Sequence, residues 1–197
     1  MQPISKLSGG LKRAGPVIAG ITLWLFLLTA PLISYPESPQ IQEYEVKAAF
    51  LFTFARLTEW PNGTFDSHEK NFIIGILGDD PFGRDLDLLR NRTIGGRRVL
   101  ITSINDASDS SACDLLFVAS SEENRLQQII DSVRKKPVLT VSDITGFENK
   151  GGIIAFFLQD NHVRFRINID AAERAKLKIS SHLLEVAEIV REKGGKK

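Results

Sequence analysis

Two pairs of polar residues follow apolar segments of the chain, at positions where α/β proteins often place reactive groups. Asp79 and Asp80 follow FIIGIL, and Ser142 and Asp143 follow PVLTV. A serine next to an aspartate raises the question of nucleophilic hydrolysis. Paired aspartates raise the question of a hard cation such as Mg²⁺ or Ca²⁺.

The sequence around these residues lacks the context that such chemistry needs. Ser142 does not lie in a G-x-S-x-G elbow, and no triad partners stand in recognisable context. GILGDDPFG lacks the G-x-G-x-x-G spacing of a nucleotide loop, and its aspartates would repel phosphate. No further oxygen ligands complete a metal site with Asp79, Asp80 and Asp143. We therefore predict no enzyme, no metal and no cofactor, and we expect the loop at Ser142 to hold a shape.

The elements that position these residues follow from the apolar periodicity. Ser120 and Glu123 form a capping-box pattern before one helix, and Gln159 to His162 has the polarity of a hairpin turn. Helices are expected over 43–60 and 84–90, from Ser120, from Asp170, and from Ser180 or Ser181 through Val190; strands are expected over 72–77, 97–102, 114–119, 137–141, 153–158 and 163–169. This order predicts an α/β fold with a mostly parallel sheet, an antiparallel edge hairpin and helices on both faces.

Composition narrows the class of partner. Apolar residues make up 43% of the 197 residues, and 12 of them are Phe, so the chain can bury a substantial core. The formal net charge is +1, which gives no electrostatic footprint for nucleic acid. Cys113 is the single cysteine and cannot form an internal disulfide. It is expected to be a buried small hydrophobe, with a reactive or intermolecular thiol as the alternative.

The N-terminal segment has the pattern of an export signal. Lys6, Lys12 and Arg13 precede an uncharged apolar stretch from Ala14 to Ile33. A cleaved signal peptide is preferred, but the stretch is also long enough for an uncleaved membrane anchor. The expected organisation is such a segment over 1–35, a linker over 36–41, one α/β domain over 42–190 and a basic tail over 191–197. Either interpretation places the domain outside the cytoplasm.

The segment from Glu43 to Trp60 is apolar on nearly all sides when it is drawn as a helix. Such a helix is buried on several sides, either in a central core position or partly against a second protein chain. This helix and the Gly146-Phe147 loop are the preferred contact regions, although Phe147 can equally fold back onto the sheet. The candidate residues for binding a partner or ligand are Phe52, Arg56, Asp79, Asp80, Phe82, Ser142, Asp143 and Phe147.

An ordered set of motifs in this chain resembles one known family. The motifs are VKAAFLFTFARLTEWP, FIIGILGDDPFG, CDLLFVASSE, PVLTVSDITGFENKGGIIAFFL and VRFRINIDAAERAKLKISSHLLEVAEIV. Together they resemble the YfiR family of bacterial periplasmic proteins, from about Tyr44 to Val190. The resemblance implies a periplasmic repressor that binds the periplasmic region of an inner-membrane diguanylate cyclase. It also implies a possible outer-membrane lipoprotein partner, a possible homodimer, and control of cyclic di-GMP and biofilm formation.

The chain departs from better-known members of that family in its cysteines. Those members use cysteine pairs, whereas here Cys113 has no partner cysteine, so control through an internal disulfide is excluded. A second hypothesis comes from a different class, a small-molecule receptor with its cleft at the carboxyl ends of the parallel strands. In that case Arg56 and Arg97 are the available cations for an anionic ligand, unless they are simply solvated surface charges.

Overall fold

The computed structural model describes residues 39–64 and 71–192, with side chains from residue 43 onward. The predicted export segment over 1–35 lies outside the described residues, as does most of the predicted tail. Among the described helices, none combines the length and apolar character needed to cross a membrane. The first of them, α2 (Pro39–Arg56), begins and ends four residues earlier than the predicted 43–60. It ends there because β1 (Thr58–Glu59) pairs antiparallel with β9 (Lys178–Ile179).

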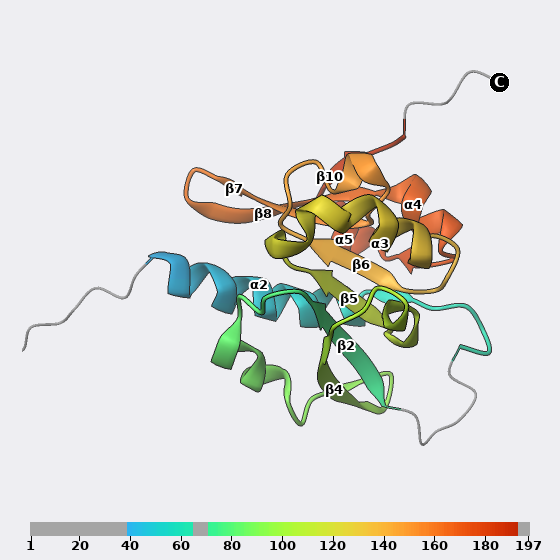
Figure 1. Ribbon diagram of the computed structural model, residues 1–197, viewed down its shortest axis with the longest axis horizontal. Coiled ribbons are helices and arrows are strands. Elements are labelled where there is room, and N and C mark those ends of the chain that lie inside the picture. The colour runs from blue at the N-terminus through green and yellow to red at the C-terminus, as the bar shows by residue number, and fades with distance from the viewer. Residues whose placement is uncertain (1–38, 65–70, 193–197) are drawn as a thin grey trace, which may run out of the picture. The chain divides into compact units, whose positions relative to one another are not determined.

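An eight-stranded sheet forms the centre of the described domain (Figure 1). The order across the sheet is β10-β8-β7-β6-β5-β2-β4-β3, and every neighbouring pair is parallel except β7–β8 and β3–β4. The predicted mostly parallel α/β fold is confirmed. The strands are β2 (Phe72–Leu77), β3 (Thr93–Ile94), β4 (Arg97–Ile104), β5 (Leu115–Val118), β6 (Leu139–Ser142), β7 (Ile154–Gln159), β8 (His162–Asn168) and β10 (Glu188–Val190).

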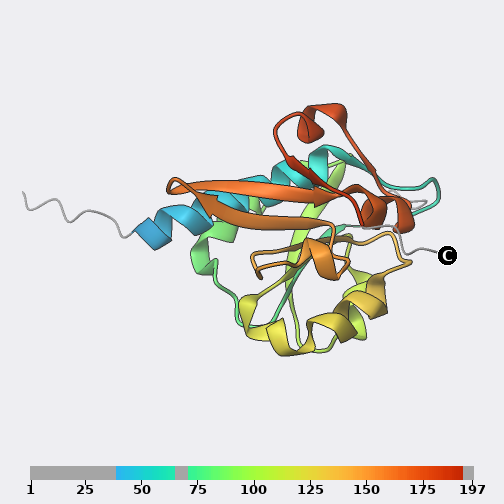
Figure 2. The same ribbon diagram turned by 90° about the horizontal axis from the view of Figure 1, so that it is seen from above.

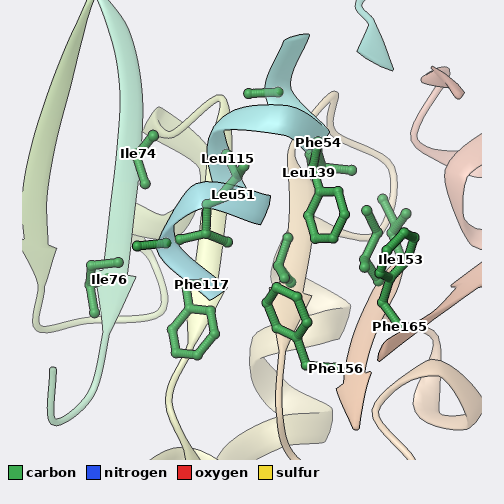
Figure 3. Close-up of a cluster of buried hydrophobic side chains, with 14 of the residues drawn as sticks. Leu51, Phe54, Ile74, Ile76, Leu115, Phe117, Leu139, Ile153, Phe156 and Phe165 are labelled. Carbon is green, nitrogen blue, oxygen red and sulfur yellow. The ribbon is translucent and has the colours of Figure 1, made fainter. Parts of the chain in front are cut away.

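Helices cover both faces of the sheet, as predicted. Figure 2 shows α2 on one side of the strands and α3 (Leu126–Val133) on the other. The two faces bury separate apolar clusters, because alternate residues of a strand point to opposite faces. Leu51 and Phe54 of α2 point toward the strands in the first cluster, where the Phe54 and Phe165 ring centroids lie 4.8 Å apart (Figure 3). Burial of such side chains stabilises the fold by about 1.5–3 kcal/mol each.

Short helices connect these layers, and two of them begin differently from the prediction. They are the 3₁₀ helices η2 (Gly83–Leu89), η3 (Asp109–Ala112), η4 (Ser120–Arg125) and η5 (Glu148–Lys150), and the α-helices α4 (Ile169–Arg174) and α5 (Ser181–Leu184). The predicted capping box at Ser120 is wrong, since no side chain caps η4. Asn168 rather than Asp170 caps α4, by accepting from the Ala171 amide at 2.9 Å. Ser180 caps α5, as one of the two predicted alternatives.

The last part of the chain corrects the prediction most clearly. The helix expected through Val190 ends at Leu184, and β10 then extends the sheet beyond the β7–β8 hairpin. Ion pairs link this strand, and Glu192 just after it, to the rest of the domain. Arg166 Nε donates to Glu188 at 2.9 Å, and Arg174 makes two hydrogen bonds of 2.5 and 2.6 Å to Glu192. These partners lie on β8 and α4, so local helical periodicity could not reveal the strand.

Candidate functional site

A cleft of about 510 Å³ opens beside the carboxyl ends of β5 and β6. Its walls are formed by residues 43–47 of α2, the loop after β6 and the β7–β8 hairpin. Parallel sheets of this type commonly bind ligands at this end of the strands. The lining residues are Glu43, Tyr44, Lys47, Ser120, Asp143, Ile144, Thr145, Gly146, Glu148, Phe156, Phe157, Leu158 and Arg166.

Asp143 joins the loop after β6 to α2 through two hydrogen bonds. Its Oδ2 accepts from Lys47 Nζ at 2.7 Å and from the Tyr44 hydroxyl at 2.9 Å. Lys47 is 3% exposed, and its ammonium also lies 2.5 Å from Glu43 Oε1. Burial, and then the charge of Asp143, raises the pKa of Tyr44 well above its ordinary value, so the phenol stays neutral and donates. Asp143 is therefore used to neutralise a buried lysine.

Ser142 is fully buried, and both functions of its hydroxyl are taken by the backbone. Oγ donates to the Val118 carbonyl at 2.7 Å and accepts from the Ile144 amide at 3.0 Å. These bonds link the ends of β5 and β6 and shape the loop that follows. Nothing in this geometry activates Ser142 as a nucleophile, because no described side chain with a basic nitrogen or carboxylate bonds to its hydroxyl.

The loop after β2 places its polar residues away from Asp143. Asp79 and Asp80 are exposed, and neither lines the cleft. The Asp79 amide donates to Ser121 Oγ at 2.9 Å, and Asp80 Oδ1 accepts from the Phe82 amide at 2.8 Å, which closes a tight turn. Phe82 is 3% exposed and packs edge-on against Phe117 at 4.7 Å. Within the described residues, no group of three or more His, Cys, Asp or Glu is arranged to hold a metal ion.

The two remaining aromatic candidates have opposite surroundings. Phe147 is fully buried, and a Cβ on Gly152 would overlap its ring. The alternative in which Phe147 folds back onto the sheet is therefore the one observed, and a partner cannot reach it in this conformation. Phe52 is half-buried on α2, with the exposed Arg56 guanidinium 5.7 Å and the Arg92 guanidinium 5.8 Å from its ring centroid. Phe52 and Arg56 thus form a small surface of their own.

The candidate residues consequently separate into different places, and only Asp143 lines the cleft. Sequence reasoning missed Lys47, Tyr44, Glu148 and Arg166, which line it with Asp143. One indication was available, because Lys47 is the charged residue that interrupts an otherwise apolar part of α2. Arg56 and Arg97, the cations considered for an anionic ligand, are not among its lining residues.

The fold is α/β, and Ser142 and Asp143 at the end of β6 bond to other groups of the protein. Residues 44–188 match the model of the YfiR/HmsC-like family, and the chain belongs to this family. Its proteins are periplasmic regulators rather than enzymes.

Two solved structures are similar to this chain, and the first of them supports the fold alone. A conserved domain protein from Vibrio cholerae O1 biovar El Tor aligns with a TM-score of 0.52 at 10% identity, over 76% of this chain and 60% of that one. The ABC domain in complex with L-Trp from Streptococcus pneumonia gives a TM-score of 0.47 at 11% identity, over 77% of this chain and 60% of that one. The chain thus spans less than two thirds of either structure. No curated protein matches it.

Proposed function

We propose that this protein is exported to the periplasm and represses an inner-membrane diguanylate cyclase by binding its periplasmic region. Membership of the YfiR/HmsC-like family is the observation that carries this proposal. Repression of the cyclase lowers cyclic di-GMP and restrains biofilm formation. An outer-membrane lipoprotein that sequesters the repressor, and a homodimer, are further partners consistent with this role.

The outer side of α2 offers a surface suited to a protein partner. Val46 is 43% exposed, and the half-buried Phe52 lies between Arg56 and Arg92. The neighbouring η2 adds Leu88, which is 39% exposed. Aromatic and arginine side chains contribute most strongly at protein interfaces. We call Val46, Phe52, Arg56, Leu88 and Arg92 the α2 surface and propose that it contacts the receptor.

Deletion of the gene tests the proposal in cells. We expect cyclic di-GMP and surface attachment to rise, and the wild-type gene to restore both. The double substitution Phe52→Ala and Arg56→Glu should fail to restore repression, although the protein accumulates normally in the envelope. Val186→Ala is the matched control, because Val186 is 65% exposed and lies outside the α2 surface. It should restore repression fully.

A binding experiment with purified proteins tests the choice of receptor and the role of the α2 surface separately. The purified protein should retain the periplasmic region of the cognate cyclase, and the α2 double substitution should weaken this binding by about tenfold or more. Unchanged cyclic di-GMP after deletion, under several growth conditions, would refute repression. Normal repression by the double variant would instead reject the α2 surface and leave the family role intact.

A further inference from the structure

The cleft beside Asp143 carries a surplus of carboxylates after its internal ion pairs are assigned. Lys47 is shared by Glu43 and Asp143. Arg166 also lines the cleft, but its guanidinium pairs at 2.9 Å with Glu188, which lies outside the lining. Glu148 remains as the third carboxylate of the lining. Its contact with Arg166 is long, at 4.0 Å from Oε1. The cleft therefore favours a positively charged guest over an anion.

Glu148 supplies an independent sign of a missing partner. The residue is only 4% exposed, and its Oε1 accepts from the Asn149 side-chain amide at 2.9 Å. Oε2 is buried and has no hydrogen-bond partner among the residues that the structure describes. Buried carboxylate oxygens normally have partners, because desolvation without a compensating bond is strongly unfavourable. A donor supplied by a bound molecule would satisfy this oxygen.

The apolar part of the same cleft indicates the body of the guest. Phe157 is half-buried, and Leu158 is 53% exposed on the hairpin. Tyr44 presents a ring that already lies 4.2 Å from the Lys47 ammonium. The volume of about 510 Å³ suits a small organic molecule. The Phe157 ring centroid lies 4.0 Å from the Arg166 guanidinium, so both rings already contact protein cations. The acidic groups therefore supply the site for the charged end of an amine, and the exposed Leu158 supplies a surface for its apolar part.

Glu148 also borders a second cleft, of about 800 Å³, on the side of β10. That cleft is lined by Arg134, Lys150 and Arg191 as well, and its lining includes no aromatic side chain. Cations and the lack of aromatic walls make it unsuitable for an organic amine. The two linings thus assign the guest to the first cleft.

We propose that the cleft lined by Tyr44, Asp143, Glu148 and Phe157 binds a small organic amine with an apolar, preferably aromatic, body. The ammonium donates to Glu148 Oε2, and the apolar body lies against Leu158. This site is independent of the α2 surface and of the choice of receptor. The ligand charge is opposite to the one that Arg56 and Arg97 suggested from the sequence.

A matched series of three probes on the purified wild-type protein tests the charge requirement. The probes are 2-phenylethylamine, the neutral 2-phenylethanol and the anionic 3-phenylpropionate, titrated by NMR chemical-shift changes. We expect saturable binding of the amine, about tenfold or more tighter than either analogue. Perturbed amides should include Gly146 and Phe157. Equal binding of all three, or no binding of the amine, would overturn the proposal without any variant.

Glu148→Gln then tests the residue. It keeps the shape and the Oε1 acceptor but removes the charge, so the amine should bind about tenfold or more weakly while the alcohol is unaffected. Glu185→Gln is the matched control, since Glu185 is exposed and lies outside the cleft. Unchanged amine affinity in a folded Glu148→Gln protein would overturn the assignment. Nα-acetyl-lysine methylamide as a fourth probe distinguishes a lysine side chain of a docked protein from a free aromatic amine.

Discussion

Replacement of Asp143 by Asn should destabilise the protein because it removes the charge opposite a buried lysine. The side chains of Lys47 and Asp143 are 4% and 12% exposed, so solvent screens their pairing only weakly. Each hydrogen bond to a charged group contributes about 1.5–3 kcal/mol. Two donors, Lys47 Nζ and the Tyr44 hydroxyl, converge on Asp143 Oδ2. The amide oxygen of Asn retains acceptor capacity, and Glu43 still neutralises the lysine in part.

These opposing effects give an expected loss of about 2 kcal/mol in the free energy of unfolding. Urea unfolding followed by far-ultraviolet circular dichroism measures this loss, and the melting temperature should fall by about 4–8 °C. Lys47→Met provides the second arm of a double-mutant cycle. In that background Asp143→Asn should have a much smaller effect, with a coupling energy of about 1–2 kcal/mol.

The reasoning fails if Asp143→Asn changes the unfolding free energy by less than about 0.5 kcal/mol, the range typical of surface substitutions. It also fails if the loss is the same in the Lys47→Met background. In that case the pairing of Asp143 with Lys47 would not be the source of the stabilisation. Ligand affinity is measured separately, so this test does not depend on the amine site.

Three further predictions follow from buried or paired groups. Ser142→Ala should lower the unfolding free energy by about 1–3 kcal/mol, since it leaves backbone groups without their side-chain partner; thermal melting measures this, and no change would contradict it. Burial raises the pKa of Cys113 to about 11, so iodoacetamide at pH 8 should react about 100-fold more slowly with the native protein than with the urea-unfolded chain. The same shift stabilises the fold below the ordinary thiol pKa of 9.0, and this contribution should disappear as the pH rises through about 11. Hydrogen bonds from Arg174 lower the pKa of Glu192, so its contribution is complete above the ordinary value of 4.5 and is lost as the pH falls below it. The protection factors of the β10 amides against hydrogen exchange should fall in that acid range, and Glu192→Gln should lower them already at pH 7, whereas equal protection in both proteins would contradict the ion-pair account.

The pattern of apolar residues was enough to predict the sheet, because each central strand is buried on both faces. FIIGIL forms β2 over the predicted residues, and the order of strands and helices predicted a mostly parallel sheet. The same local reasoning failed for β10 and for the start of η4. At β10 the deciding contacts come from Arg166 and Arg174, which are distant in sequence. At η4, Ser121 instead accepts from the Asp79 amide of a neighbouring loop.

The candidate site shows the same division in a sharper form. Ser142 and Asp143 were predicted to belong to a loop that holds a shape, because the sequence around them lacks a catalytic motif. Their partners could not be recognised, because Asp143 and Lys47 are 96 residues apart and meet only when α2 packs on the sheet. Likewise, the sequence left open whether Phe147 faces a partner, and only the fold shows that its ring is buried close to Gly152.

The sequence by itself determined the class of this protein: its ordered motifs placed it in a family of periplasmic regulators, and its periodicity defined an α/β sheet. Only the tertiary structure decided the sign of the charge in the cleft, where Glu43, Asp143 and Glu148 come together from three separate segments. The physical reason is that periodicity depends on near neighbours along the chain. The charge of a cleft depends instead on which distant side chains share it, and on which of them already neutralise one another.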